Sequence, residues 1–552
     1  MRYSRRGFLK RAGVGAGAVA VSGGGALAPR AQAARSGTVA TSSTTFGRLF
    51  PDLPAFAQAT PRVKEALSAL GASGGPLDAN DDLSRGPKLL ITDLGLSVNN
   101  PNNPAHTAGT TFLGQFVDHD ITFDTASVMG VPTDPGSSPN GRTPSLDLDS
   151  VYGAGPVASP QLYEPADRAK LRIESGGVFE DLPRDASSFA IIADPRNDEN
   201  LMIAGLQCAF ILFHNNAVEW ARSNGYADAA FEQARQLTRW HYHWVVLHEF
   251  LPLVVGQRLV DNVLRTGRRF YKPRMREGFI PVEFQAAAYR FGHSMVRPSY
   301  RANLKGDEGN PFFAMVFDPA GEGQADPVDL RGGARAPRRF IGWQTFFDFG
   351  DGEVKPNKKI DTKISTPLFD LPLGAIASHD SPQSLPQRNL LRQLTWSLPS
   401  GQEIAKAMAV VKLTPAELKE LKPYGFDKST LLWYYVLREA ELHTDGLTLG
   451  KVGGRIVAEV LIGLIQSDPS SYLVQKPTWT PTLTTAGSSF RMKDFLTFAG
   501  VDPTTRHGAS TTAPDSAAVP ASELRQERFL ERLKLQAFCK HRASAAMSPC
   551  FA

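Results

Sequence analysis

The stretch from Gly114 to Asp124, GQFVDHDITFD, sets polar side chains among bulky apolar ones. If it is helical, Gln115, Asp118 and His119 fall at positions i, i+3 and i+4 and share one face. That face would present an amide, a carboxylate and an imidazole together, and burying such groups is costly unless they are satisfied. Taken alone, the triplet DHD is as typical of a buried hydrogen-bonded cluster as of a reactive site.

A second group of oxygen-bearing side chains lies in the stretch TPSLDLDSVYG. Thr143, Ser145, Asp147 and Asp149 alternate along it. In an extended loop, alternate residues can direct their oxygens at one cation, and hard oxygen ligands of this kind suit Ca²⁺. The spacing differs from that of an EF-hand loop. An Asp- and Ser-rich turn without a metal is the alternative interpretation.

Three more motifs carry residues that could do chemistry, and each also has a structural interpretation. An arginine can pair with a carboxylate near a helix start, and a lone histidine in an apolar setting is often a satisfied core residue. The motifs are Arg196 with Glu199 in ADPRNDENL, Arg290 with His293 in AYRFGHSM, and Asn389 with Arg392 on one helical face of LPQRNLLRQL.

In this order the motifs resemble the animal-type haem peroxidases of the peroxidase-cyclooxygenase superfamily, which includes myeloperoxidase. The similarity runs from about Gly114 to Gly401, and more weakly to about Gly500. The resemblance implies a bacterial-type exported member: a haem-dependent peroxidase that uses H₂O₂ to oxidise small organic donors, with halides as further candidate donors.

The resemblance also assigns roles around the haem. His119 would be the distal histidine, with Gln115 as its neighbour and Arg196 as the distal arginine. His119 would move a proton between the two peroxide oxygens as base and then acid. Arg196 would stabilise the negative charge that develops as the O–O bond breaks.

On the other side of the haem, His293 would be the proximal iron ligand. Asn389 would accept a hydrogen bond from its second ring nitrogen, which tunes the ligand. Arg290 and Arg392 are expected to bind the same cofactor, haem b.

The acidic residues complete the expected site. In the family, the carboxylates that match Asp118 and Glu199 can form ester bonds to haem, so ester-linked haem b is an expectation here. Asn200 stands where myeloperoxidase has a methionine, which argues against a further sulfonium link. The expected calcium ligands are Asp120, Thr143, Ser145, Asp147 and Asp149.

Two other functions are open on the sequence. A haem-dependent lipid oxygenase would need a radical tyrosine and a long apolar channel; aligning on Trp343 puts Ile341 where cyclooxygenases have that tyrosine. A non-catalytic, calcium-stabilised adhesion or matrix protein would have no chemical need for His119, Arg196 and His293 together.

The elements that must position these residues are mainly helical. Apolar residues recur at helical spacing from Leu201 onward, and alternating strand patterns are scarce. We therefore expect a mainly α fold: a single large helical domain with long loops and little β over residues 34–504. Residues 505–522 are rich in Ser, Thr, Ala and Pro and are typical of a linker. Residues 523–552 would form a C-terminal helical tail.

The N-terminus predicts export. Arg5 and Arg6 followed by Phe8, Leu9 and a Gly/Ala-rich stretch are typical of a twin-arginine signal peptide over residues 1–33, ending in AQA. That stretch is too weakly apolar for a membrane anchor. We expect a periplasmic or extracellular protein, the twin-arginine machinery as a transport partner, and no stable membrane insertion.

Charge and cysteines add limits. The chain has 60 Lys and Arg against 55 Asp and Glu, and six of the basic residues but no acidic residue lie within residues 1–33. The remainder holds 54 against 55, so nothing indicates a nucleic-acid partner. Cys208 lies in an apolar run and is expected to be packed. Cys539 and Cys550 could form a disulfide in an oxidising compartment, or stay free.

Overall fold

The structure is a computed structural model, and it describes residues 45–176, 179–376 and 378–504. The predicted signal peptide, linker and C-terminal tail lie outside the described residues, as do Cys539 and Cys550.

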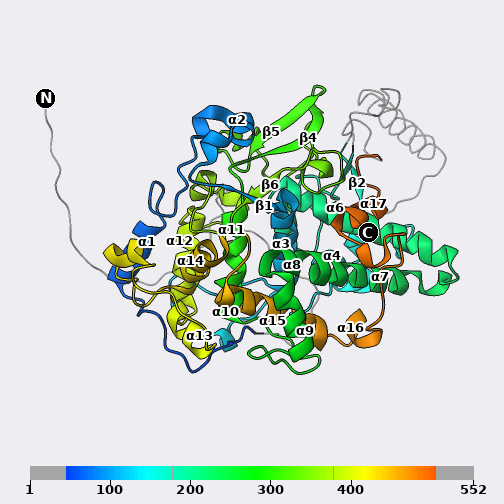
Figure 1. Ribbon diagram of the computed structural model, residues 1–552. Helices are drawn as coiled ribbons and strands as arrows, with labels where there is room; N and C mark the ends of the chain where they lie inside the picture. Colours follow the sequence, from blue (N-terminus) through cyan, green and yellow to red (C-terminus); the bar gives the residue numbers. More distant parts are fainter. Residues whose placement is uncertain (1–44, 177–178, 377, 505–552) are drawn as a thin grey trace, which may run out of the picture. The chain divides into compact units, whose positions relative to one another are not determined.

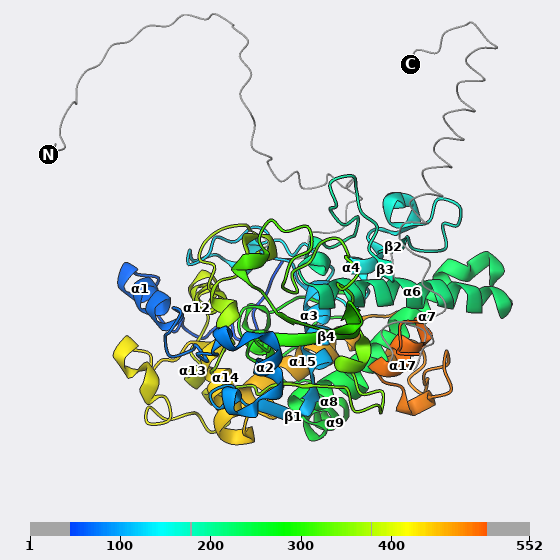
Figure 2. The same cartoon turned by 90° about the horizontal axis from the view of Figure 1, so that it is seen from above.

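Long helices build the core, which confirms the mainly α prediction (Figure 1). α3 packs against α6 and α6 against α7, while α14 contacts both α12 and α15. Figure 2 shows α6 and α7 side by side in the second view as well. The longest helices are α3 (Ala108–Ile121), α6 (Leu201–Ser223), α7 (Ala230–Val245), α12 (Leu385–Thr395), α14 (Leu432–Thr444) and α15 (Lys451–Ser467).

Shorter helices connect and cover these. A π-helical turn, Val246–Phe250, joins α7 to α8. The shorter α-helices are α1 (Pro61–Leu70), α2 (Gly86–Thr92), α4 (Asp149–Tyr152), α5 (Gly155–Ala158), α8 (Leu251–Val255), α9 (Gln257–Thr266), α10 (Val282–Gln285), α11 (Gly292–Met295), α13 (Gly401–Ala407), α16 (Tyr472–Gln475) and α17 (Met492–Phe498).

The strands of the described residues form three small antiparallel pairs, which agrees with the expected low β content. β1 (Asn102–Thr107) pairs with β6 (Pro356–Lys358), and β2 (Glu174–Ser175) pairs with β3 (Glu180–Asp181). The longest pair joins β4 (Ser299–Asp307) to β5 (Asn310–Met315), with Ser299 opposite Met315 and Asp307 opposite Asn310.

α6 illustrates why the apolar runs are helical. Asn200 caps it by accepting a hydrogen bond from the Ile203 N–H at 3.0 Å. By length and composition α6 could cross a membrane, but 83% of its most apolar window is buried inside the protein. Its apolarity is that of a core helix. Cys208 is fully buried within it, as predicted, and burial raises the pKa of its thiol to about 12.

α3 carries the first functional motif through the centre of the fold. Gly114 lies against Phe250, and a Cβ at this position would stand only 3.0 Å from that ring. The helix ends at Thr122, whose N–H still donates to the Asp118 carbonyl at 3.0 Å. Because successive helical residues are rotated by about 100°, the last turn can direct neighbouring side chains to different surroundings.

Candidate active site

A cavity of about 470 Å³ lies between α3, α11, α12 and the segment that precedes α6. His119 and His293 both line it, so the structure brings the two predicted haem-side histidines to one site. Nearly all the other residues predicted to act on or bind the cofactor also line the cavity: Gln115, Asp118, Arg196, Glu199, Arg290 and Arg392. Asn389 lies behind this wall, next to His293.

The imidazole of His119 is held with one nitrogen free for proton transfer. Its Nδ1 lies 2.9 Å from Oδ1 of Asn197. The amide nitrogen of Asn197 donates to Gln207 at 2.8 Å, so its oxygen is the group that faces His119. Nδ1 therefore carries the ring hydrogen and Nε2 keeps its lone pair. Burial, reinforced by the nearby charge of Arg196, lowers the pKa of His119 to about 3, which keeps the ring neutral.

Asn197 is a residue of this site that the sequence did not single out. Its position between Arg196 and Glu199, inside a motif that was recognised, was the only available signal. A side chain that orients the ring of a distant histidine cannot be recognised from residue spacing, because the two residues lie far apart in the sequence.

Two carboxyl groups and two amides form the rest of this wall. Nε2 of Gln115 donates to Oε1 of Glu199, and the same oxygen lies 3.8 Å from Nε2 of His119. Asn200 donates to Oε1 of Gln115 at 3.3 Å, which fixes the direction of the Gln115 amide. Burial raises the pKa of Glu199 to about 8 and also raises that of Asp118.

Arg196 is anchored by Asp194. Its Nη2 donates to Oδ2 of Asp194 at 2.7 Å, its Nε donates to Oδ1 at 3.0 Å, and Nη2 also reaches the His119 carbonyl at 3.0 Å. Its guanidinium lies 4.3 Å from the centre of the Phe123 ring. Asp194 is fully buried. Although burial opposes ionisation, the Arg196 charge and hydrogen bonds hold the pKa of Asp194 well below its usual range.

The hydrogen bond beside His293 runs opposite to the expected direction. The amide nitrogen of Asn389 lies 2.8 Å from Nδ1 of His293, while the amide oxygen accepts from Arg290 at 3.2 Å. The expected acceptor oxygen is thus taken by a guanidinium. Ligation of iron through Nε2 needs the hydrogen on Nδ1, so it would require rotation of this amide. Burial, followed by the charge of Arg290, lowers the pKa of His293 to about 3, which leaves a neutral ring.

Besides Arg196, three guanidinium groups lie on the cavity wall. Arg392 pairs with Asp124 at 2.6 Å, and Arg388 pairs with Asp380 at 3.0 Å. Arg290 donates to the Gln285 carbonyl as well as to Asn389, and burial lowers its pKa to about 9. Arg388 was not predicted from the sequence, although it directly precedes Asn389. Guanidinium groups suit carboxylates such as the propionates of haem.

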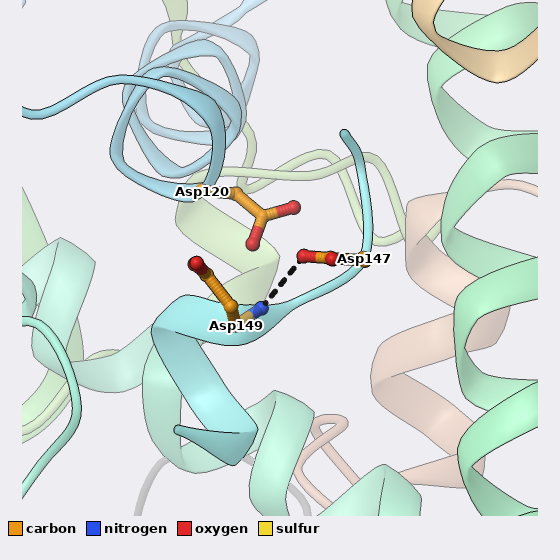
Figure 3. A group of neighbouring side chains, drawn as sticks. All are labelled: Asp120, Asp147 and Asp149. Carbon is orange, nitrogen blue, oxygen red and sulfur yellow. Dashed lines mark hydrogen bonds between the residues drawn. The ribbon is translucent and has the colours of Figure 1, made fainter. Parts of the chain in front are cut away.

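The expected calcium ligands come together beside α3. One carboxylate oxygen from each of Asp120, Asp147 and Asp149 lies within 4.8 Å of the others. Figure 3 shows Asp120 at the end of its helix pointing toward the loop that carries the other two. Burial and then the charge of Asp149 raise the pKa of Asp147 to about 7, and burial and the neighbouring aspartates raise that of Asp120. Such mutual repulsion is relieved by a bound cation.

The loop alternates as the sequence suggested. Pro144, Leu146, Leu148 and Ser150 are buried, whereas the four predicted ligand positions between them are more exposed. Asp120 accepts from the Leu148 N–H at 3.2 Å and from the Ser150 hydroxyl at 3.0 Å. Thr143 donates its N–H to Asp149 at 2.9 Å, and Ser145 donates its N–H to the Thr143 carbonyl at 2.8 Å. Their roles as cation ligands stay predictions.

One tyrosine of the cavity bears on the lipid-oxygenase alternative. Ile341 does not line the cavity, but a tyrosine, Tyr289, does. Its hydroxyl donates to the Gly114 carbonyl at 3.1 Å and its ring stacks on Phe284. Apolar side chains also line the cavity, among them Val316, Leu368, Leu371 and Ile376.

The residues of the cavity fit haem as a group. Neutral imidazoles and guanidinium groups that suit propionates line it, and so do the carboxyl groups of Asp118 and Glu199. The acidic cluster fits a hard divalent cation, because it offers carboxylate oxygens only.

In the sequence comparisons, this chain is similar to animal haem peroxidases. Residues 129–320 match the family model described as animal haem peroxidase. The human protein called probable oxidoreductase PXDNL is 29% identical over 220 residues, which cover 35% of this chain and 15% of that protein. Thyroid peroxidase of Canis lupus familiaris is 25% identical over 233 residues, covering 36% and 24%. The chain therefore matches less than a quarter of the length of these relatives.

Solved structures share the fold over most of the chain. Peroxidase A from Dictyostelium discoideum superposes with a TM-score of 0.54 at 15% identity, covering 85% of this chain and 95% of that one. A fatty acid alpha-dioxygenase from Arabidopsis thaliana superposes with a TM-score of 0.53 at 13% identity, covering 87% and 82%. At these identities the likeness shows the fold alone.

Proposed function

We propose that this chain, whose residues 129–320 match the animal haem peroxidase family model, is a haem-dependent peroxidase that uses H₂O₂ to oxidise small donors. One observation carries the proposal: His119, Arg196 and His293 line the same cavity. Haem, when bound there, supplies the redox-active iron. Phenols are the first donors to test, and halides are further candidates.

His119 is the proton carrier in this proposal. Its lone pair at Nε2 takes the proton of one peroxide oxygen and returns it to the departing oxygen, which leaves as water. Asn197 holds the hydrogen on Nδ1 throughout, so the ring keeps one basic nitrogen. The neutral state of the buried ring supports this role, since a protonated imidazole could not act as the base.

Arg196 stabilises charge. As the O–O bond breaks, negative charge develops on the oxygen that leaves, and a guanidinium already oriented by Asp194 needs no reorganisation to meet it. On the proximal side, His293 would ligate the iron, and Arg290 and Arg392 would bind the propionates. Ester links through Asp118 and Glu199 belong to the same proposal, and so does Ca²⁺ at the acidic cluster.

The first test is spectroscopic. Protein produced with haem should show a Soret band that shifts after one equivalent of H₂O₂ and recovers when a phenol is added. His119→Ala should keep the Soret band and lose about two to four orders of magnitude in rate, the usual contribution of general acid-base catalysis. His443→Ala is the matched control, because His443 is exposed on α14. Wild-type turnover in His119→Ala would refute the assignment of the base.

A fatty-acid oxygenase is a second candidate, favoured by Tyr289 and the apolar side chains on the cavity wall. The solved structure from Arabidopsis thaliana is that of a fatty acid alpha-dioxygenase. Oxygen consumption with palmitate as substrate separates the two functions. Consumption that disappears in Tyr289→Phe, with the Soret band retained, would favour the oxygenase; no consumption beside active phenol oxidation would exclude it.

We also propose export by the twin-arginine route. Replacing Arg5 and Arg6 by lysine keeps the charge but removes the paired guanidinium groups that the machinery reads. The exported fraction of the protein should fall to background, whereas Arg30→Lys should have no effect. Unchanged export in the double variant would contradict this route.

A further inference from the structure

Arg142 connects the acidic cluster to the distal arginine. Its Nη1 lies 3.3 Å from Oδ1 of Asp149, and its Nε lies 2.9 Å from Oδ2 of Asp194. The same Oδ2 of Asp194 accepts the 2.7 Å hydrogen bond from Arg196. One guanidinium thus bridges a predicted cation ligand and the carboxylate that holds a predicted catalytic residue.

The bridge is largely removed from solvent. The side chain of Asp194 is fully buried, and those of Arg142 and Arg196 are 11% and 12% exposed. Ionic contacts at such low exposure are screened much less than surface pairs. Arg142 and Arg196 share one carboxylate oxygen of Asp194, so they cannot move independently. When one guanidinium binds that oxygen more tightly, the other is bound more weakly.

The charges near the acidic cluster indicate how cation binding would change the contacts of Arg142. Asp149 is paired with Arg142 and also accepts from the Thr143 N–H. A divalent cation bound by Asp120, Asp147 and Asp149 would neutralise Asp149 and repel the guanidinium. Arg142 would then bind Asp194 more closely, and Asp194 would hold Arg196 less tightly.

We propose that Arg142 is a positioning residue that transmits the occupancy of the cation site to Arg196 through their shared partner Asp194. This rests on the proposed function, because the state of Arg196 matters only where it acts on a bound ligand. A second path is present: Asp120 is adjacent to His119 on α3. The experiment must therefore measure how much of the coupling passes through Arg142.

Cyanide is the probe, because it binds ferric haem as an anion and needs no turnover. Its Kd is measured by the Soret shift, with saturating Ca²⁺ and after chelation, for wild type, Arg142→Gln, Arg142→Lys and Arg235→Gln. Arg235 is the control: it is more exposed and pairs with Glu232 on α7. The ratio of the two Kd values reports the coupling.

We expect Ca²⁺ to change the cyanide Kd of wild type by about tenfold, within the usual range for coupled sites. Arg142→Gln should reduce this ratio at least about fivefold, Arg142→Lys should restore part of it, and Arg235→Gln should match wild type. By linkage, cyanide must change the Ca²⁺ affinity by the same factor, which calorimetry measures independently. An unchanged ratio in Arg142→Gln with a normal Soret band overturns the proposal.

A double-mutant cycle with Asp149→Ser provides a second test in case Arg142→Gln folds poorly. Asp149→Ser keeps an oxygen ligand but removes the partner of Arg142 at the cation site. It should lower the ratio as Arg142→Gln does, and the double variant should show no further loss. Additive losses would show two separate effects and overturn the bridge. If wild type binds neither haem nor cyanide, the proposed function fails, which is a different outcome from an Arg142 variant that behaves like wild type.

Discussion

At the scale of single residues, the cavity depends on side chains that orient others. Asn197 fixes the tautomer of His119, and Asn200 fixes the direction of the Gln115 amide. Asn197 lies behind the residues that line the cavity, whereas Asn200 is one of them. Supporting partners of this kind typically change activity by 10–100-fold when removed from metal sites.

The orientation of His119 gives a prediction. Asn197→Ala removes the acceptor at Nδ1, so the ring can place its hydrogen on Nε2 and lose its base. The rate of reaction with H₂O₂, followed by stopped-flow of the Soret band, should fall about 10- to 100-fold. Asn224→Ala, at an exposed asparagine beyond α6, should keep the wild-type rate. A wild-type rate in Asn197→Ala would show that the ring is held by other contacts.

At the scale of elements, carboxylates from one segment satisfy the backbone of another. Glu439 on α14 is fully buried and accepts hydrogen bonds from the Val452 and Gly453 N–H groups at the start of α15. A Cβ at Gly450 would lie 2.4 Å from Glu439, so only glycine allows this approach. The start of α15 is thereby held against α14, because a side chain outside α15 caps its backbone.

Glu439 makes stability depend on pH. Burial raises its pKa to about 7, against an ordinary value of 4.5. The folded protein therefore binds the extra proton between pH 4.5 and 7, and this stabilisation is lost as pH rises through that window. The shift corresponds to at most about 3 kcal/mol.

Glu439→Gln removes that titration, because the amide oxygen still accepts from the α15 backbone without ionising. The free energy of unfolding of wild type should fall relative to Glu439→Gln as pH rises from about 4.5 to 7.5, measured by urea denaturation at several pH values. Glu65→Gln, at an exposed position on α1, should leave the pH dependence of wild type unchanged. Parallel pH profiles for wild type and Glu439→Gln would refute the assignment.

At the scale of the whole molecule, the acidic cluster joins parts of the chain that are otherwise held by few polar contacts. Asp120 comes from α3, Asp147 and Asp149 come from the loop before α4, and the Leu146 carbonyl accepts from His243 of α7 at 2.7 Å. Three carboxylates so close together repel each other unless they are protonated or bind a cation. The cluster is thus the place where ion binding would act on the fold as a whole.

Calcium should therefore stabilise the protein. A ligand that binds only the folded state adds about 2.7 kcal/mol at a concentration of 100 Kd. Chelation should lower the Tm, and Ca²⁺ should restore it more effectively than Mg²⁺, since the smaller ion demands a stricter octahedral geometry. Asp147→Asn should reduce the calcium effect, whereas Asp228→Asn on the exposed turn before α7 should not. A Tm and Soret band indifferent to chelation would contradict a calcium site here.

The sequence by itself determined the class of the fold and predicted which residues form the site. Apolar residues at helical spacing predicted the long core helices, and the order of five short motifs identified His119, Arg196 and His293. These features are local: they depend on residues within one or two turns or within one loop. The buried environment of Cys208 was predictable for the same reason, because it follows from the apolar run around it.

Only the tertiary structure decided how these residues are oriented. Asn197, Asn200, Arg388 and Arg142 act through partners far away in the chain, and no spacing rule reports such contacts. The reversed amide of Asn389 is an example, because its direction is set by a guanidinium that lies 99 residues away in sequence. The placement of Tyr289 on the cavity wall has the same origin. Motifs fix which groups are present, whereas the packing of distant segments fixes which atoms face one another.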